Sequence, residues 1–100
     1  MRPITATNQN KRALPVVIAD IGDGGVGLRT RGEIAIGDVL SFHLLLPGTE
    51  REIYIQARVV WALEHGAAGC AFLRIPPVDV EILRNWLKYK SQIKKPLIVV

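Results

Sequence analysis

The residues best suited to bind a ligand lie in one short stretch, where Asp20 is followed by Gly22, Gly24, Gly25 and Gly27. A glycine inside a regular element costs about 0.5–1 kcal/mol relative to alanine, so such a cluster needs a physical reason. Either the backbone turns sharply here, or a ligand approaches it closely. The carboxylate of Asp20 could read the N1–H and N2–H donors of a guanine edge, or it could cap the turn itself.

The rest of the chain offers little support for catalysis. His43 lies within an apparent strand and His65 in a turn, and neither neighbours a candidate nucleophile. The sequence contains no HExxH, GxSxG, P-loop or CxxC motif. The run GDGGVG superficially suggests a dinucleotide fingerprint, but that fingerprint requires a following helix, and the residues here alternate as in a strand. We therefore expect a binding protein that is not an enzyme and has no catalytic residue, cofactor or metal.

Size and charge fit one small domain with an anionic partner. The chain has 100 residues and a net charge of +4. That charge suits a nucleotide or a nucleic acid, although many ordinary domains share it. Tyr54 and Arg58 on one strand face suggest a small RNA-binding barrel as an alternative. No RNP-like stretch accompanies them, which argues against nucleic acid as a partner.

The chain is expected to be cytoplasmic and not inserted in a membrane. It has no run of eighteen apolar residues, and its first residues lack the hydrophobic region of a signal peptide. The single cysteine, Cys70, lies between apolar neighbours and is interpreted as a small buried hydrophobic residue.

Short strands separated by tight turns must position the candidate ligand residues. The segments interpreted as strands are residues 13–21, 26–30, 39–46, 51–61 and 68–75, with a weaker one at 3–8. Within the longest segment Ile53, Ile55, Ala57, Val59 and Trp61 share one face, which we expect to be the core face. Five or six such strands predict an all-β fold, either a small antiparallel barrel or a sandwich.

The apolar period changes to that of a helix over residues 78–90, after Pro76 and Pro77. This helix needs a surface to cover, and the open end or side of the barrel is the expected one. Ile82 and Trp86 should be buried beneath it. The expected organisation is an N-terminal segment (1–12), a barrel with its closing helix (13–90) and a C-terminal tail (91–100).

Taken in order, these segments resemble the PilZ domain, a bacterial receptor module for the second messenger cyclic di-GMP. The resemblance runs from about residue 13 to 87, and it rests on the segments DIGDGGVGL, ARVVW, GAAGCAFLRI and ILRNWL. It implies a six-stranded antiparallel β-barrel with a C-terminal helix, which agrees with the pattern of strands and helix.

The resemblance also implies a ligand site in two parts. Asp20 and Gly25 match the Asp/Asn-x-Ser-x-x-Gly turn of the family, whereas Gly22 replaces the serine and removes its hydroxyl. The Arg-x-x-x-Arg segment that precedes the first strand has no intact counterpart, although Arg2 could stand where the second arginine does. The first arginine would then fall before Met1, in a longer protein of which this chain is a piece; in the other reading the chain is a divergent member of the family. Arg29, near the glycine turn, completes the expected ligand-binding set.

Two functions follow from the resemblance. The first is a cyclic di-GMP-binding regulatory module, either separate or part of a larger signalling protein, that acts on an effector protein or a covalently linked domain. The alternative is a divergent PilZ-like protein-interaction domain that does not bind nucleotide. Gly22 and the missing arginine pair favour the alternative.

Overall fold

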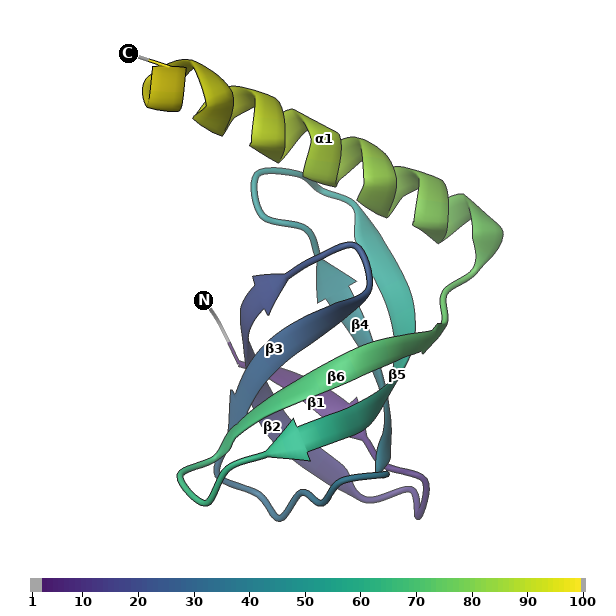
Figure 1. Ribbon diagram of the computed structural model, residues 1–100. Coiled ribbons are helices and arrows are strands. Elements are labelled where there is room, and N and C mark those ends of the chain that lie inside the picture. Colours follow the sequence, from purple (N-terminus) through teal and green to yellow (C-terminus); the bar gives the residue numbers. More distant parts are fainter. Residues whose placement is uncertain (1–2, 100) are drawn as a thin grey trace.

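The computed structural model describes residues 3–99, with side chains described up to residue 89. Its elements are β1 (Ile4–Thr7), β2 (Ala13–Ile21), β3 (Gly25–Thr30), β4 (Val39–Leu45), β5 (Glu52–Ala62), β6 (Ala67–Arg74) and α1 (Pro77–Val99). The strands close into a barrel in the order β1-β2-β3-β6-β5-β4, and every neighbouring pair is antiparallel (Figure 1). The predicted six-stranded antiparallel barrel with a C-terminal helix is confirmed.

The first strand lies within residues 1–12, ahead of the segment in which we expected the barrel. Its four residues pair with β2 from Ile4 opposite Val16 to Thr7 opposite Ala13. Thr7 also pairs with Ser41 of β4, which closes the barrel. The N-terminal segment therefore contributes a barrel strand.

Alternation of apolar and polar residues decides which side chains fill the barrel. Leu40, Phe42 and Leu44 of β4 are each exposed by no more than 2%. Ile53 and Ile55 of β5, which lie opposite them, are completely buried. Because successive side chains of a strand point to opposite faces, the same period places their polar neighbours outside.

Trp61 departs from this alternation, and the expectation that it faces the core is wrong. Val59 pairs with Cys70 of β6, and Trp61 pairs with the adjacent Gly69, so that Val60 is an extra residue. An extra residue in one strand is a β-bulge, and it reverses the phase of the residues that follow. Trp61 consequently lies on the outer face of the barrel, with 46% of its surface exposed.

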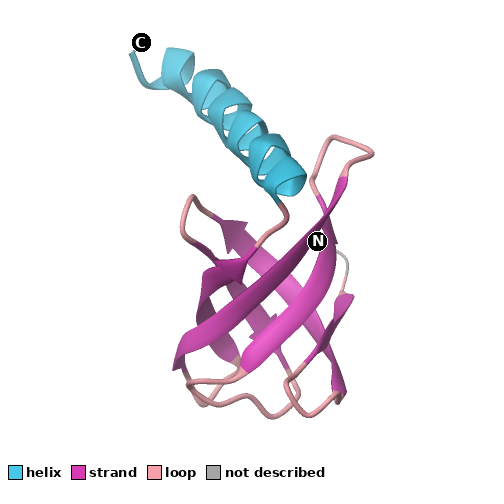
Figure 2. Cartoon of the chain, turned by 90° about the vertical axis from the view of Figure 1, so that its right-hand side faces the viewer, coloured by secondary structure: helices cyan, strands magenta, loops and turns pink. Residues whose placement is uncertain are grey.

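The helix α1 crosses one end of the barrel and runs on beyond it (Figures 1 and 2). Its first turn is fixed by the carboxylate of Asp79, which accepts a hydrogen bond of 2.9 Å from the backbone N–H of Tyr54 in β5. Leu83 is its buried anchor. Ile82 and Trp86 pack against the core but are only partly buried, which corrects the expectation that both are covered.

Trp86 contacts the barrel through a polar as well as an apolar interaction. Its indole N–H donates a hydrogen bond of 2.9 Å to the carbonyl of Pro47, in the turn between β4 and β5. The helix also continues to Val99, through most of the segment that we expected to be a tail. No helix in the described part of the chain is long and apolar enough to cross a membrane.

Candidate functional site

The glycine-rich segment forms the hairpin turn between β2 and β3. The turn is closed by a hydrogen bond of 2.9 Å from the N–H of Gly22 to the carbonyl of Gly25. None of the four glycines between residues 22 and 27 has a positive φ angle. A left-handed backbone therefore does not explain the cluster, and the reason has to be sought in close approach.

Neighbouring atoms closely approach Gly25 and Gly27, but they do not approach Gly22 and Gly24 in the turn. A Cβ at Gly25 would collide with the backbone carbonyl of Cys70, and a Cβ at Gly27 would collide with the carboxylate of Asp20. By contrast, a Cβ at Gly24 would meet nothing within 4 Å, and one at Gly22 would make only an ordinary contact. The two strand glycines are thus required by their neighbours, whereas the two turn glycines leave open space.

Asp20 lies on the outer face of the barrel because β2 contains a bulge of its own. Ile18 pairs with Leu28, and Asp20 pairs with the adjacent Gly27, so that Ala19 is an extra residue. In a strand without the bulge, Asp20 would lie two residues beyond the buried Ile18 and would point to the core in the same way. Because Ala19 is unpaired, the carboxylate lies outside, over Gly27.

A single cross-strand row connects Asp20 with Trp61. Asp20 of β2 pairs with Gly27 of β3, Gly27 pairs with Gly69 of β6, and Gly69 pairs with Trp61 of β5. We call these four residues the Asp20–Trp61 row. The indole of Trp61 lies over Gly69, in the space that a Cβ at Gly69 would need.

Both side chains of the row lean toward its centre. A carboxylate oxygen of Asp20 lies within the space that a Cβ at Gly27 would need, and the indole nitrogen of Trp61 lies within the space that a Cβ at Gly69 would need. Since directly paired residues have Cβ positions about 5 Å apart, the carboxylate and the indole are neighbours across two bare glycines.

A shallow groove of about 390 Å³ follows this row, and we call it the glycine groove. Its volume falls within the ~300–1,000 Å³ typical of small-molecule sites. It is open to solvent, so a ligand would lie on the barrel surface with one side uncovered. The lining residues are Asp20, Gly22, Gly24, Gly25, Val26, Gly27, Val60, Trp61, Gly69, Cys70 and Ala71.

Three of the five predicted ligand residues, Asp20, Gly22 and Gly25, line this groove together. Arg29 lies two residues beyond Gly27 on the same outer face of β3, beside the groove but outside its lining. Arg2 lies outside the described residues.

Sequence reasoning assigned Trp61 to the core and missed its place in the groove. The signal that could have revealed it is Gly69, a strand glycine whose missing side chain makes room for a large neighbour.

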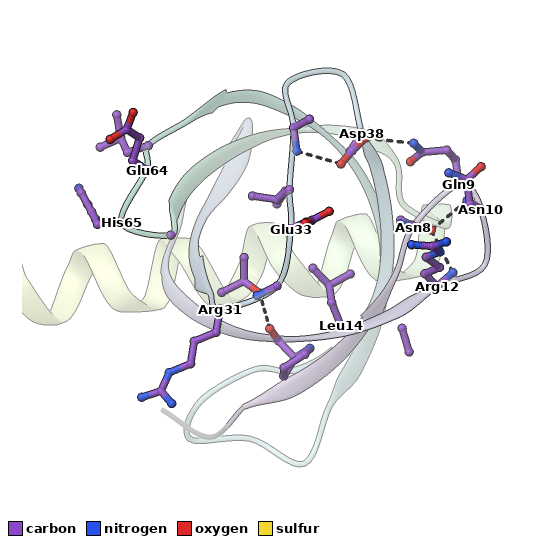
Figure 3. A pocket seen from close by; sticks show the side chains of 18 residues that line it. Asn8, Gln9, Asn10, Arg12, Leu14, Arg31, Glu33, Asp38, Glu64 and His65 are labelled. Atoms are coloured by element: carbon purple, nitrogen blue, oxygen red, sulfur yellow. Dashed lines mark hydrogen bonds between the residues drawn. The ribbon is translucent and has the colours of Figure 1, made fainter.

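A larger hollow of about 1180 Å³ lies at the barrel end away from α1, around the loops that follow β1, β3 and β5 (Figure 3). Several of its polar groups bind one another or the backbone of its loops. The Gln9 amide donates to the Asp38 carboxylate at 3.0 Å, and that carboxylate also accepts the N–H of Ala35. The side-chain oxygen of Asn8 accepts backbone hydrogen bonds within its own loop, one of them from Arg12. These contacts hold loops in place, so we assign the candidate site to the smaller glycine groove.

The glycine groove is linked to α1 through β6. The N–H of Phe72 donates a hydrogen bond of 3.0 Å to the carbonyl of Gly24 in the turn. From Phe72 the chain continues through the end of β6 at Arg74 into α1 at Pro77. A displacement of the turn would therefore act directly on the strand that leads into the helix.

Comparison with known proteins identifies one family. A family model described as the PilZ domain matches residues 1–89. That match covers β1 through β6 and the part of α1 whose side chains are described. No curated protein matches the chain.

Proposed function

The chain belongs to the PilZ domain family, and from that premise we propose that it is a regulatory module that binds cyclic di-GMP in the glycine groove. PilZ domains are generally cyclic di-GMP-binding modules, so the family supplies the class of ligand. The observation that carries the proposal is the approach of the Asp20 carboxylate and the Trp61 indole to one another over two bare glycines.

This arrangement suits a guanine base. The half-exposed indole of Trp61 offers a stacking surface, and stacking of a base on an aromatic side chain contributes about 1–3 kcal/mol. The carboxylate of Asp20 has acceptors for the N1–H and N2–H donors, in charge-assisted hydrogen bonds. Because Gly27 and Gly69 have no side chains, the carboxylate and the indole can lie close against the sheet, beneath a bound base.

The phosphates of the ligand require cations. Arg29 is the exposed arginine nearest to Gly27 along β3, and Arg2 is the second arginine of the proposed ligand set. The absence of an intact Arg-x-x-x-Arg segment removes a bidentate contact, which should weaken binding about 10–100-fold relative to a complete site. We expect a dissociation constant in the range of tens of micromolar or higher.

We further propose that the bound ligand acts on an effector protein or a covalently linked domain in the cytoplasm. The hydrogen bond between Phe72 and Gly24 supports this, because it couples the turn of the ligand site to the strand that leads into α1. Binding and relay, without catalysis, is the chemistry for which these residues are suited.

The alternative function is a PilZ-like protein-interaction domain that does not bind nucleotide. Gly22 favours it, because the family turn carries a serine there and this chain has lost that hydroxyl. The incomplete arginine segment points the same way.

Isothermal titration calorimetry with cyclic di-GMP tests the proposal. The unmodified chain should bind cyclic di-GMP, and it should not bind cyclic di-AMP, whose adenine has no N1–H to donate to Asp20. Asp20→Ala should abolish measurable binding, because the guanine donors then remain unpaired.

Asp23→Ala is the matched control for this experiment. Asp23 carries the same charge three residues away, but it lines the neighbouring groove against α1 and not the glycine groove. Its substitution should leave the affinity within about twofold. Absence of binding by the unmodified chain would favour the interaction domain, and equal affinity in Asp20→Ala would return Asp20 to the role of a turn cap.

A further inference from the structure

We propose that Arg58 of β5 binds a phosphate of the ligand, in addition to the arginines already assigned to the site. This inference rests on the proposed function and assigns a new residue to that site. Arg58 stands on the outer face of the barrel, between the buried Ala57 and the buried Val59.

The position of Arg58 follows from the row next to the Asp20–Trp61 row. Arg58 pairs with Ala71 of β6, and Ala71 pairs with Gly25 of β3. Ala71 and Gly25 both line the glycine groove. Arg58 therefore stands at the edge of this groove, with two of the smallest residues between its side chain and the glycine turn.

The distance between the two rows suits one nucleotide. Ala71 and Gly69 are two residues apart on β6, which corresponds to about 7 Å along the strand. A base stacked on Trp61 would thus have a cation one sugar-length away on the side of the glycine turn. An arginine side chain is long enough to span this interval.

Arg58 has no competing partner in the described part of the chain. No ion pair or side-chain hydrogen bond involves it there, and its cross-strand neighbours, Val39 and Ala71, are apolar. All five guanidinium donors therefore remain for a ligand, in a fork that fits a phosphate bidentately.

Arg29 and Arg58 lie on opposite sides of the Asp20–Trp61 row. Arg29 pairs with Ala67 of β6, two residues from Gly69 in one direction, and Arg58 pairs with Ala71, two residues from Gly69 in the other. A ligand that carries two phosphates around one stacked base would meet a cation on each side. A cyclic dinucleotide has this form.

The test compares Arg58→Gln with Arg51→Gln in calorimetric titrations with cyclic di-GMP at two salt concentrations. Arg51 is an exposed arginine in the turn before β5 and does not line the glycine groove, so its substitution removes the same charge at a distance. Arg58→Gln should weaken binding about 10–100-fold and reduce its salt dependence, whereas Arg51→Gln should change the affinity less than about twofold.

Arg58→Lys provides a second variant, which keeps the charge but loses the fork, and its affinity should fall between those of the parent and Arg58→Gln. Thermal unfolding of each variant checks that the barrel is intact. If Arg58→Gln binds cyclic di-GMP with the same affinity and salt dependence as the parent, the role of Arg58 is overturned. The proposed function would still stand in that case. Absence of binding by the parent would overturn both.

Discussion

The indole of Trp61 occupies the space in which a side chain at Gly69 would lie. These two residues are paired across β5 and β6, and each depends on the other. A larger residue at position 69 would displace the indole, and without the indole the outer face of β6 would be bare at the centre of the glycine groove.

Gly69→Ala should therefore displace Trp61 without unfolding the barrel. The new Cβ would meet the half-exposed indole, which can swing into solvent, so the free energy of unfolding should change by less than about 1 kcal/mol. Tryptophan fluorescence, recorded in a Trp86→Phe background, should shift to longer wavelength, and affinity for cyclic di-GMP should fall. An unchanged emission spectrum would show that the indole does not lie where we describe it.

Gly25→Ala should destabilise the fold. Its Cβ would meet the backbone carbonyl of Cys70, which cannot move without distorting β6, and overpacking of this kind costs about 1–3 kcal/mol. Urea unfolding measures the loss. Gly24→Ala is the control, since its Cβ would enter open space, and equal stability of the two variants would contradict the packing described between β3 and β6.

Leu83 should contribute more to the docking of α1 than any other side chain described on the helix. It is 3% exposed, so Leu83→Ala should lower the free energy of unfolding by about 2–5 kcal/mol. Trp86→Phe, which removes the indole N–H bound to Pro47, should cost about 1 kcal/mol. Val78→Ala, at a position 71% exposed on the same helix, should stay within about 0.5 kcal/mol of the parent in the same urea titration.

Cys70 should be protected from alkylation in the folded protein. Burial raises the pKa of its thiol from 9.0 to about 11. At pH 9 the folded protein should then carry roughly 50-fold less thiolate than the unfolded chain, and iodoacetamide should react correspondingly slowly until urea is added. Rapid labelling of the folded chain would contradict this burial.

The same pKa shift has a consequence for stability. The folded state holds the thiol proton more tightly than the unfolded state does. The resulting contribution of Cys70 to the free energy of unfolding is therefore complete below pH 9 and is lost as the pH rises toward 11. Between pH 8 and pH 10.5 the free energy of unfolding should therefore fall less in Cys70→Ala than in the parent. An identical fall in both proteins would exclude the thiol as the group responsible.

Alternation and turn residues were sufficient to predict the barrel. Leu40, Phe42 and Leu44 repeat with a period of two, and this repeat alone assigns them to the core. The change to a helical period after Pro77 likewise predicted α1. These signals are local, so they can be recognised without knowledge of which strands pair.

The candidate site depended on pairing, which the sequence does not reveal. Ala19 and Val60 are ordinary strand residues, and nothing in their type marks them as bulges. The glycines were assigned to a tight turn, yet the crowded ones are Gly25, Gly27 and the distant Gly69, and each is crowded by a residue of a neighbouring strand. The orientation of Trp61 could not be predicted for the same reason.

The two bulges make the register of strand pairing as important to the groove as the identity of its residues. If β2 paired regularly, with Ala19 opposite Gly27, Asp20 would point into the barrel, and a regular β5 with Val60 opposite Gly69 would turn Trp61 inward in the same way. Deleting Ala19 or Val60 would instead leave the pairs Asp20–Gly27 and Trp61–Gly69 in phase, with both side chains outside. A homologue one residue shorter at either bulge would thus keep the groove, whereas one that retains every recognisable residue but pairs these strands regularly would have no groove in which to use them.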